Sequence, residues 1–359
     1  MSRTAFLILE NGKVFEGKGF GADNDVVGEL VFTTSMTGYL GTLTDPNYFG
    51  QVVLQTFPLI GNYGVVPAEC ESDKLGLKAY IVRNTCQEPS NFRCEGVLDI
   101  FLRDKGLTGL CDVDTRAITK IVREYGVMNC KITSTLDNLE KDLEELKAYK
   151  VTNAVNSVTS ENVTEIKAEN AKYNVALWDF GVKNSLKNSL TQCGCNVTVF
   201  PANTKAEDII ASNPNGVVLS GGPGDPTECT DIVNQIKALC EKKIPTFGIG
   251  LGHQLLAMSQ GATTEKLKYG HRGANQPSKE ISTGRVYITT QNHGYTVTNT
   301  SLPANAKETF ANANDATCQG IEYTDMPAFS VQFHPTAGGG KLGTGFLFDK
   351  FIALMDANK

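Results

Sequence analysis

Residues 248–252, with the sequence GIGLG, have the Gly-x-nucleophile-x-Gly spacing of a nucleophile elbow, the sharp strand-to-helix turn that exposes a reactive side chain. Apolar residues precede and follow them, as such a turn requires. The N-terminus of the following helix would favour a thiolate or an oxyanion. Position 250, where the nucleophile would stand, is glycine. On this segment alone we favour a glycine-rich turn that does no chemistry.

Three further segments combine residue types that suit a reactive site. Residues 219–226 (LSGGPGDP) follow an expected strand, and their glycines could offer backbone N–H groups to a carboxylate or an oxyanion. Residues 290–295 (TQNHGY) suit a polar loop that lines a pocket, and residues 330–336 (SVQFHPT) end an apolar strand. Each has a purely structural alternative, since glycine-rich and polar segments commonly serve only as turns.

The histidines gather near these segments. We predict that His253, His293 and His334, three of the four in the chain, lie in loops that follow strands, while His271 stands between glycines in GHRG. His334 would be placed to act as a base at the carboxyl edge of a sheet. A lone histidine is more often structural, but this concentration favours a functional role.

Composition excludes several classes of protein. With 359 residues, 41% hydrophobic and 20% charged, the chain predicts a soluble globular protein of two or three domains. Its net charge of −6 disfavours nucleic-acid binding, and no apolar run is long enough for a membrane helix or a signal peptide. Its ten cysteines show no zinc-ligand spacing, so we expect reduced thiols, no metal and a cytoplasmic location.

The pattern of predicted elements divides the chain in two. Residues 1–135 are typical of a mixed α/β domain, with a hairpin around Asn11-Gly12 and a helix over 116–125 capped by residues 112–115. Residues 151–172 are polar and predict a linker. Beyond them short apolar strands (175–178, 196–200, 216–219, 245–249) alternate with amphipathic helices (184–192, 206–211, 230–241, 251–259). This alternation predicts a parallel sheet covered on both faces, with ligands beyond the carboxyl ends of its strands.

Taken together and in this order, the reactive segments resemble the class I glutamine amidotransferase domain, a Cys-His-Glu hydrolase that releases ammonia from glutamine. The likeness spans about residues 174–355. Residues 33–39 (TTSMTGY), 43–46 (LTDP), 60–64 (IGNYG) and 112–116 (DVDTR) resemble the amino-terminal domain of the carbamoyl phosphate synthetase small subunit. Residues 269–277 and 291–295 fit that family too, so the resemblance covers nearly the whole chain.

This resemblance implies an α/β protein with a small-subunit amino-terminal domain at 1–150, a linker at 151–172 and a flavodoxin-like, mostly parallel amidotransferase domain at 173–359. It implies two partners, glutamine and a large ATP-using subunit that turns the released ammonia into carbamoyl phosphate. No cofactor is then expected in this chain, because ATP and Mg²⁺ belong to the large subunit. The pathway served would be pyrimidine or arginine biosynthesis.

The resemblance also assigns roles to individual residues. His334 matches the general base, and the backbone at Gly222 and Leu251 would form the oxyanion hole. The residues that would hold glutamine are Ser35, Gly222, Gly224, Leu251, Gln254, Asn292, Gly294 and Tyr295.

Two positions depart from the family. Gly250 stands where the nucleophilic cysteine is expected, and Thr336 stands where a glutamate should orient His334. Cys240 cannot substitute, because it ends the preceding predicted helix. Three hypotheses follow: a small subunit with impaired glutaminase activity, an ordinary glutaminase with engineered changes at positions 250 and 336, or a non-catalytic module that binds glutamine for regulation. The amino-terminal segments disfavour other amidotransferase synthetases, and the absence of another elbow with Ser or Cys disfavours an unrelated hydrolase.

Overall fold

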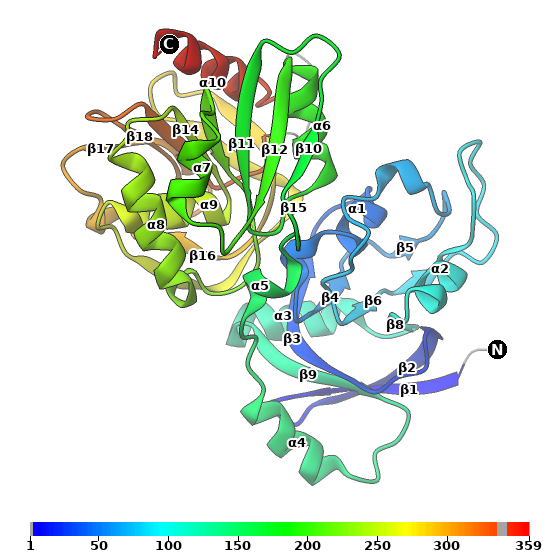
Figure 1. Cartoon of the computed structure of the whole chain (residues 1–359). Helices are drawn as coiled ribbons and strands as arrows, with labels where there is room; N and C mark the ends of the chain where they lie inside the picture. The colour runs from blue at the N-terminus through cyan, green and yellow to red at the C-terminus, as the bar shows by residue number, and fades with distance from the viewer. Residues whose placement is uncertain (1–2, 336–342, 359) are drawn as a thin grey trace. The chain divides into compact units, whose positions relative to one another are not determined.

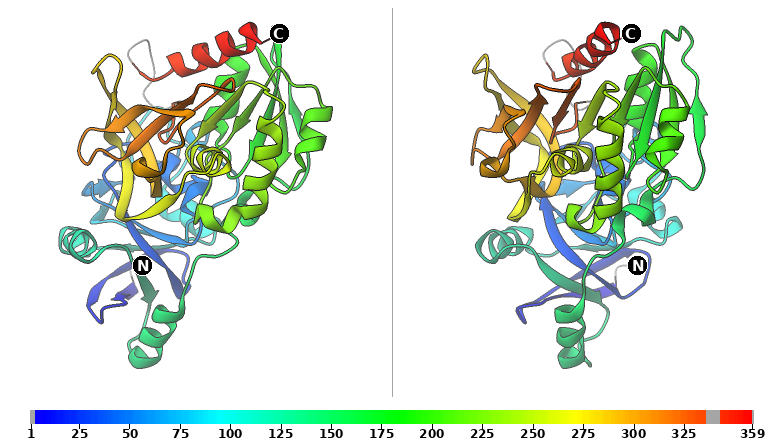
Figure 2. Two further views of the ribbon diagram at one scale, coloured as in Figure 1. Left: turned by 90° about the vertical axis from the view of Figure 1, so that its left-hand side faces the viewer. Right: turned by 60° about the vertical axis from the view of Figure 1, so that its left-hand side comes forward.

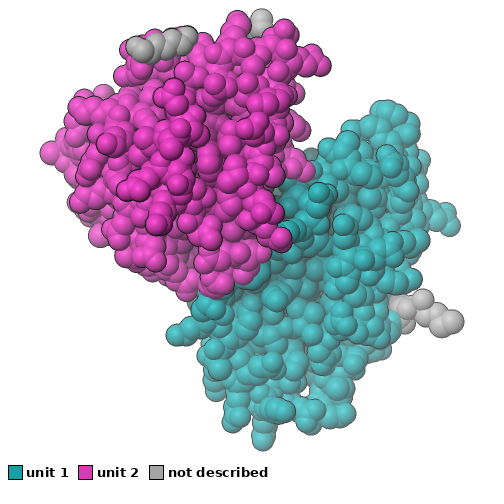
Figure 3. All heavy atoms as spheres, viewed as in Figure 1, with its two compact units in different colours: residues 1–152 teal, residues 153–359 magenta. Residues whose placement is uncertain are grey.

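The computed structural model describes residues 3–335 and 343–358 (Figure 1). The chain forms two compact units, Met1–Thr152 and Asn153–Lys359 (Figure 3). None of the helices in the described residues has the length and apolar character that a bilayer crossing requires.

The first unit is built on a closed seven-stranded barrel. The strands in barrel order are β1 (Arg3–Leu9), β2 (Val14–Gly21), β8 (Thr108–Cys111), β6 (Ala79–Ile81), β4 (Gln51–Gln55), β3 (Val26–Thr33) and β9 (Met128–Thr133). Its helices are α1 (Tyr39–Leu43), α2 (Leu98–Asp104), α3 (Thr115–Tyr125) and α4 (Leu139–Ala148), and β5 (Leu59–Ile60) pairs with β7 (Asn84–Thr85).

Local sequence signals account for two of its elements. The predicted hairpin is present, because Gly12 supplies the positive φ of 85° that lets β1 turn back onto β2. Helix α3 begins where the Asp114 carboxylate accepts the Ala117 N–H at 3.0 Å, and it ends at Gly126, whose φ is 93°. Its apolar stripe, Ile118 and Val122 included, is buried.

The second unit is a ten-stranded sheet with helices on both faces (Figure 2). The strands in sheet order are β10 (Thr164–Ile166), β12 (Cys195–Pro201), β11 (Tyr173–Asp179), β13 (Gly216–Leu219), β14 (Thr246–Ile249), β19 (Ala328–Val331), β18 (Cys318–Tyr323), β17 (Ala306–Asn312), β15 (Thr264–Glu280) and β16 (Val286–Val297). The five strands from β12 to β19 are mutually parallel, as the strand–helix alternation predicted, and the others extend the sheet antiparallel.

Two apolar cores lie on opposite faces of this sheet. One packs α7 (Ala206–Ala211), α8 (Thr230–Cys240) and α9 (Leu251–Ser259) against residues such as Trp178. The other packs α6 (Asn184–Gln192) and α10 (Phe346–Ala357) around Phe247, whose ring stacks on Phe329 at 4.4 Å between centroids. The alternating faces of the strands therefore hold the helices on both sides.

Two segments differ from expectation. The expected linker, 151–172, contains α5 (Ala154–Val158) and β10, and β10 pairs antiparallel with β12. Backbone pairing at a sheet edge needs no apolar pattern, so its polar sequence resembled a linker. Residues 290–295 were expected to form a loop, but they lie inside β16, because that strand pairs with β15 from His271↔His293 to Gly273↔Gln291.

Replacing the cap of α3 should weaken the first unit. Asp114→Ala removes the acceptor for the Ala117 N–H and should lower the free energy of unfolding by about 1 kcal/mol. Urea unfolding followed by far-UV circular dichroism measures the change. Asp114→Asn, which keeps a side-chain oxygen, is the control and should lose much less; equal losses in the two variants would contradict this account of the helix start.

Candidate functional site

The turn between β14 and α9 is shaped by close backbone contact. A Cβ on Gly252 would lie 2.3 Å from the Leu219 carbonyl oxygen, and one on Gly248 would lie 2.9 Å from the Gly252 oxygen. Both glycines are therefore required where α9 packs onto the ends of β13 and β14. Gly250 between them has φ 58° and ψ −113°, and its N–H donates to the Val331 oxygen at 2.9 Å. The turn predicted from GIGLG is present.

A side chain at position 250 would enter a confined space. An added Cβ would lie 3.3 Å from the Gly221 Cα and 3.9 Å from the Gln332 carbonyl oxygen, in the region between the loop after β13 and the end of β19. The positive φ would strain any L-residue here. The turn therefore has the geometry of a nucleophile elbow, and glycine leaves it without a nucleophile.

The loop after β13 brings the expected oxyanion-hole residues together. A Cβ on Gly222 would lie 2.7 Å from the Leu251 side chain and 2.4 Å from the Phe180 carbonyl oxygen. Ser220 holds the start of the loop, since its hydroxyl accepts the Phe180 N–H at 2.9 Å. Gly224, with φ 92°, continues the loop. Gly222 and Leu251 are thus neighbours at the N-terminus of α9, where backbone N–H groups favour negative charge.

His334 lies beside this turn. It is 7% exposed, and its backbone N–H donates to the Thr290 oxygen at 3.0 Å, which ties it to β16. Its side chain lines a cavity of about 10 Å³, room for a single water molecule. The other lining residues are Gly181, Lys183, Ser185, Leu186, Gly221, Ile249 and Pro335. Thr336, expected at the position of the orienting carboxylate, lies outside the described residues.

The sequence analysis missed Lys183 and Ser185, which share this cavity with His334. The available signal was their position: they follow β11 directly, so their segment reaches the same carboxyl edge as the loops after β13 and β14. Lys183 brings the one formal positive charge among the described lining residues.

Gln254 on α9 connects three elements of the site. Its Nε2 donates to the Tyr295 carbonyl oxygen at 2.7 Å and to Gln332 Oε1 at 2.9 Å. The same Tyr295 oxygen is contacted by His293 Nδ1 at 2.8 Å. Four residues after Gly250, Gln254 thus fixes β16 and the end of β19 to the elbow helix. Asn292 and Gly294 flank His293 on β16, so these expected glutamine contacts lie along one strand.

Ser35 is the one expected site residue in the first unit. Its hydroxyl oxygen accepts from the Thr33 hydroxyl at 3.3 Å, and its carbonyl accepts from Gln55 Nε2. The Tyr80 hydroxyl in turn donates to Gln55 Oε1 at 3.0 Å. Buried polar contacts therefore fix the backbone and side chain of Ser35 within its own unit.

The positions expected for two histidines were wrong. His253 lies inside α9 and His293 inside β16, not in loops, because tertiary packing buries both. His253 Nδ1 lies 2.8 Å from Ser330 Oγ, and burial lowers the pKa of His253 to about 3. Burial, helped by the neighbouring His271, also lowers the pKa of His293 well below its ordinary value. Both rings are therefore neutral parts of the interior.

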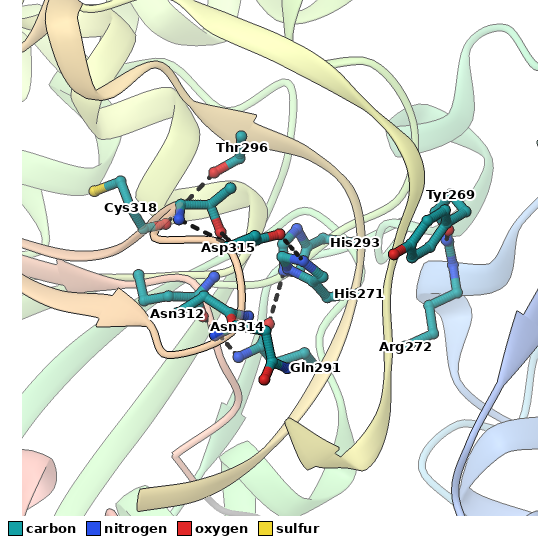
Figure 4. Close-up of polar contacts among 12 residues, drawn as sticks. Tyr269, His271, Arg272, Gln291, His293, Thr296, Asn312, Asn314, Asp315 and Cys318 are labelled. Atoms are coloured by element: carbon teal, nitrogen blue, oxygen red, sulfur yellow. Dashed lines mark hydrogen bonds and ion pairs between the residues drawn. The ribbon is translucent and has the colours of Figure 1, made fainter. Parts of the chain in front are cut away.

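A polar cluster, drawn in Figure 4, joins His293 on β16 to His271 on β15, the first strand of its hairpin. His271 meets His293 edge-on at 5.0 Å between centroids, and its Nε2 lies 2.8 Å from Asp315 Oδ2. Partial burial raises the pKa of Asp315, but the hydrogen bond and charge of His271 outweigh it and hold the pKa at about 2. Gln291 Oε1 contacts His293 Nε2 at 2.9 Å. The cluster stiffens the β15–β16 hairpin that carries Asn292 to Tyr295.

Among the described residues that line the cavity beside His334, none is a cysteine that could replace the absent thiol. The ten cysteines are free, and none lines the cavity beside His334. Cys240 ends α8, where burial raises its pKa to about 12, so it stays a protonated thiol. Within the described residues, no three His, Cys, Asp or Glu side chains are grouped so as to hold a metal ion.

Acid should destabilise the second unit through His253. The unfolded histidine binds a proton below about pH 6.5, whereas the buried ring does so only near pH 3, so stability falls as the pH drops through this window. One such group contributes a slope of about 1.4 kcal/mol per pH unit. His253→Gln should lower the slope by this contribution, while His293, whose pKa is also lowered, keeps its own. Urea unfolding followed by the fluorescence of Trp178, the single tryptophan, measures it.

Ser330→Ala is the matched control for this measurement. It removes the partner of the His253 ring and leaves the ring buried, so the acid-dependent slope should persist. An unchanged slope in His253→Gln would contradict the neutral state of His253.

Comparison with known proteins places this geometry in a family. Residues 176–354 match the model of the class I glutamine amidotransferase, and residues 7–132 match that of the carbamoyl-phosphate synthase small chain, CPSase domain. The chain is 48% identical over 348 residues to the carbamoyl phosphate synthase small chain of Clostridium perfringens, covering 97% of this chain and 98% of the relative. It is 45% identical over 351 residues to that of Lactococcus lactis subsp. cremoris, covering 98% of each.

These matches agree with the family resemblance stated from the sequence and with the α/β fold expected from it. The alignments with these two relatives cover nearly the whole chain, so the similarity extends over both units. The chain belongs to the carbamoyl phosphate synthase small chain family.

Proposed function

We propose that this chain is the small subunit of a carbamoyl phosphate synthase that assembles with a large ATP-using subunit and hydrolyses glutamine poorly or not at all. The complex would then depend on free ammonia. One observation carries the proposal: the turn between β14 and α9 has the shape of a nucleophile elbow and holds Gly250. We place the complex in the cytoplasm, with ATP and Mg²⁺ on the large subunit, in pyrimidine or arginine biosynthesis.

The missing thiol closes the covalent route. Amide hydrolysis at such an elbow needs a nucleophile that bonds to the glutamine carbonyl carbon and expels ammonia, and glycine has no side chain to do so. His334 remains beside the turn, but Thr336 provides no carboxylate to fix its tautomer or stabilise its charged form. Because such residues act as a unit, restoring one of them should recover little activity.

The geometry favours retained binding of glutamine. Gly222 adjoins Leu251 at the helix N-terminus, and Gln254 is joined to Tyr295 by a 2.7 Å hydrogen bond. We infer that these groups, with Gly224, Asn292 and Gly294, form the part of the glutamine pocket that the second unit provides. The same retained pocket supports a second candidate function, a non-catalytic module that binds glutamine for regulation. Glutamine binding to this chain alone, measured by calorimetry, separates the two: the regulatory module requires it.

Reconstitution tests the main proposal. The chain is mixed with a compatible large subunit, ATP and bicarbonate, and carbamoyl phosphate is measured with glutamine or with ammonium chloride. We expect product from ammonium chloride and little from glutamine. Glutamine-driven turnover equal to the ammonia-driven rate would overturn the assignment of position 250.

A double variant, Gly250→Cys with Thr336→Glu, is the positive control for this assay. It restores both missing groups, so glutamine-driven turnover should rise well above that of Gly250→Cys alone. The genomic sequence decides whether positions 250 and 336 were engineered.

Restoring the cysteine should also destabilise the second unit. At φ 58° and 3.3 Å from the Gly221 Cα, a Cβ at position 250 should lower the free energy of unfolding by about 1–3 kcal/mol. Urea unfolding followed by Trp178 fluorescence measures the change. Gly261→Ala is the matched control for the strain of a positive φ alone, because Gly261 has φ 99° and no atom lies within 4 Å of its added Cβ. A Gly250→Cys variant clearly more stable than the parent would contradict the strain argument.

A further inference from the structure

Gln332 is buried at the junction of β19 and the segment that carries His334. It is 1% exposed, and its backbone N–H donates to the Gln319 oxygen at 2.9 Å, which continues the sheet beyond β19. Its side chain turns to the elbow helix, where Oε1 accepts the Gln254 Nε2 hydrogen bond at 2.9 Å. The expected glutamine contacts named from the sequence do not include Gln332.

This contact fixes the orientation of the Gln254 carboxamide. A carboxamide nitrogen has two N–H donors, and Gln254 gives one to Gln332 Oε1 and the other to the Tyr295 oxygen at 2.7 Å. With both donors committed, Oε1 is the polar atom of Gln254 left for a ligand. Free glutamine offers N–H donors at its α-ammonium and at its side-chain amide, which an acceptor oxygen would bind.

Gln332 is a poor choice for stability alone. Its own Nε2 is buried and has no hydrogen-bond partner among the described residues, which disfavours the folded state. A methionine would occupy similar space without a buried unpaired donor. The acceptor Oε1 is therefore the atom that gives glutamine an advantage at position 332.

We propose that Gln332 is a positioning residue of the glutamine pocket, which holds the Gln254 carboxamide with Oε1 directed to the ligand. The inference rests on the proposed function, since that proposal makes Gln254 a glutamine contact. Without the acceptor at position 332, only the Tyr295 oxygen holds the Gln254 carboxamide in this orientation, and a half-turn becomes more accessible because the terminal torsion is broad and roughly two-fold. It would then present N–H donors to the donors of the ligand.

Calorimetric titration of the full chain with glutamine tests this role. We expect Gln332→Met to bind glutamine about tenfold more weakly than the parent, a loss typical of one buried hydrogen bond. Gln332→Asn, whose oxygen is withdrawn by one methylene, should lose affinity similarly and serves if Gln332→Met does not fold. Gln332→Glu keeps an acceptor at the same reach and should stay within about threefold of the parent.

A double variant shows whether Gln332 acts through Gln254. Gln254→Met with Gln332→Met should bind glutamine no more weakly than Gln254→Met alone, because the positioned group is already gone. Gln235→Met is the control: it removes a carboxamide acceptor from the Ala206 N–H, so it should alter stability and leave glutamine affinity unchanged.

Three results would overturn the inference. These are parental affinity in Gln332→Met, additive losses in the double variant, or no glutamine binding by the parent chain. None of them affects the reconstitution assay. That assay tests the ammonia-dependent function by measuring the carbamoyl phosphate formed from glutamine. The two proposals therefore fail on separate measurements.

Discussion

The second unit depends on one backbone constraint, the left-handed turn that joins β14 to α9. At this turn the helix lies so close to the sheet that Gly248 and Gly252 leave no room for a Cβ against the Gly252 and Leu219 backbone oxygens. The N–H of Gly250 then binds Val331, so the turn also fixes the end of the neighbouring strand β19. The close approach of α9 to the sheet at this turn therefore sets the position of the loop after β13 and of the segment that carries His334.

Polar side chains beside that turn connect it to neighbouring strands of the second unit. Gln254 joins the helix to β16 and to Gln332, and His293 and His271 join β16 to Asp315. His253 and His293 are neutral because burial opposes their charge, so they act as neutral hydrogen-bonding groups. A site built in this way keeps its shape when the reactive group is removed, since the glycine at position 250 takes no part in the side-chain network.

Much of this arrangement could be predicted from the sequence where the signal is local. The apolar runs gave β11 to β14, Asp114 gave the start of α3, and GIGLG gave the turn at Gly250. The strand over 290–295 could not be predicted, because its polar residues show no strand pattern and lie in β16 through backbone pairing with β15 of the same hairpin. The prediction that His253 lies in a loop was wrong for a related reason, because tertiary packing buries this residue inside α9. The place of Lys183 and Ser185 in the site could have been predicted from the rule that the carboxyl ends of adjacent parallel strands lie at one edge of the sheet.

The barrel of the first unit has a consequence for how the small subunit can associate. Its seven strands close into a ring, so within the described residues each strand of the barrel has a neighbour on both sides. The closed ring therefore disfavours strand addition to the barrel as a mode of binding. A protein that docks on the barrel would recognise surface side chains of its helices and loops, so the specificity of that contact would come from surface residues more than from backbone hydrogen bonds.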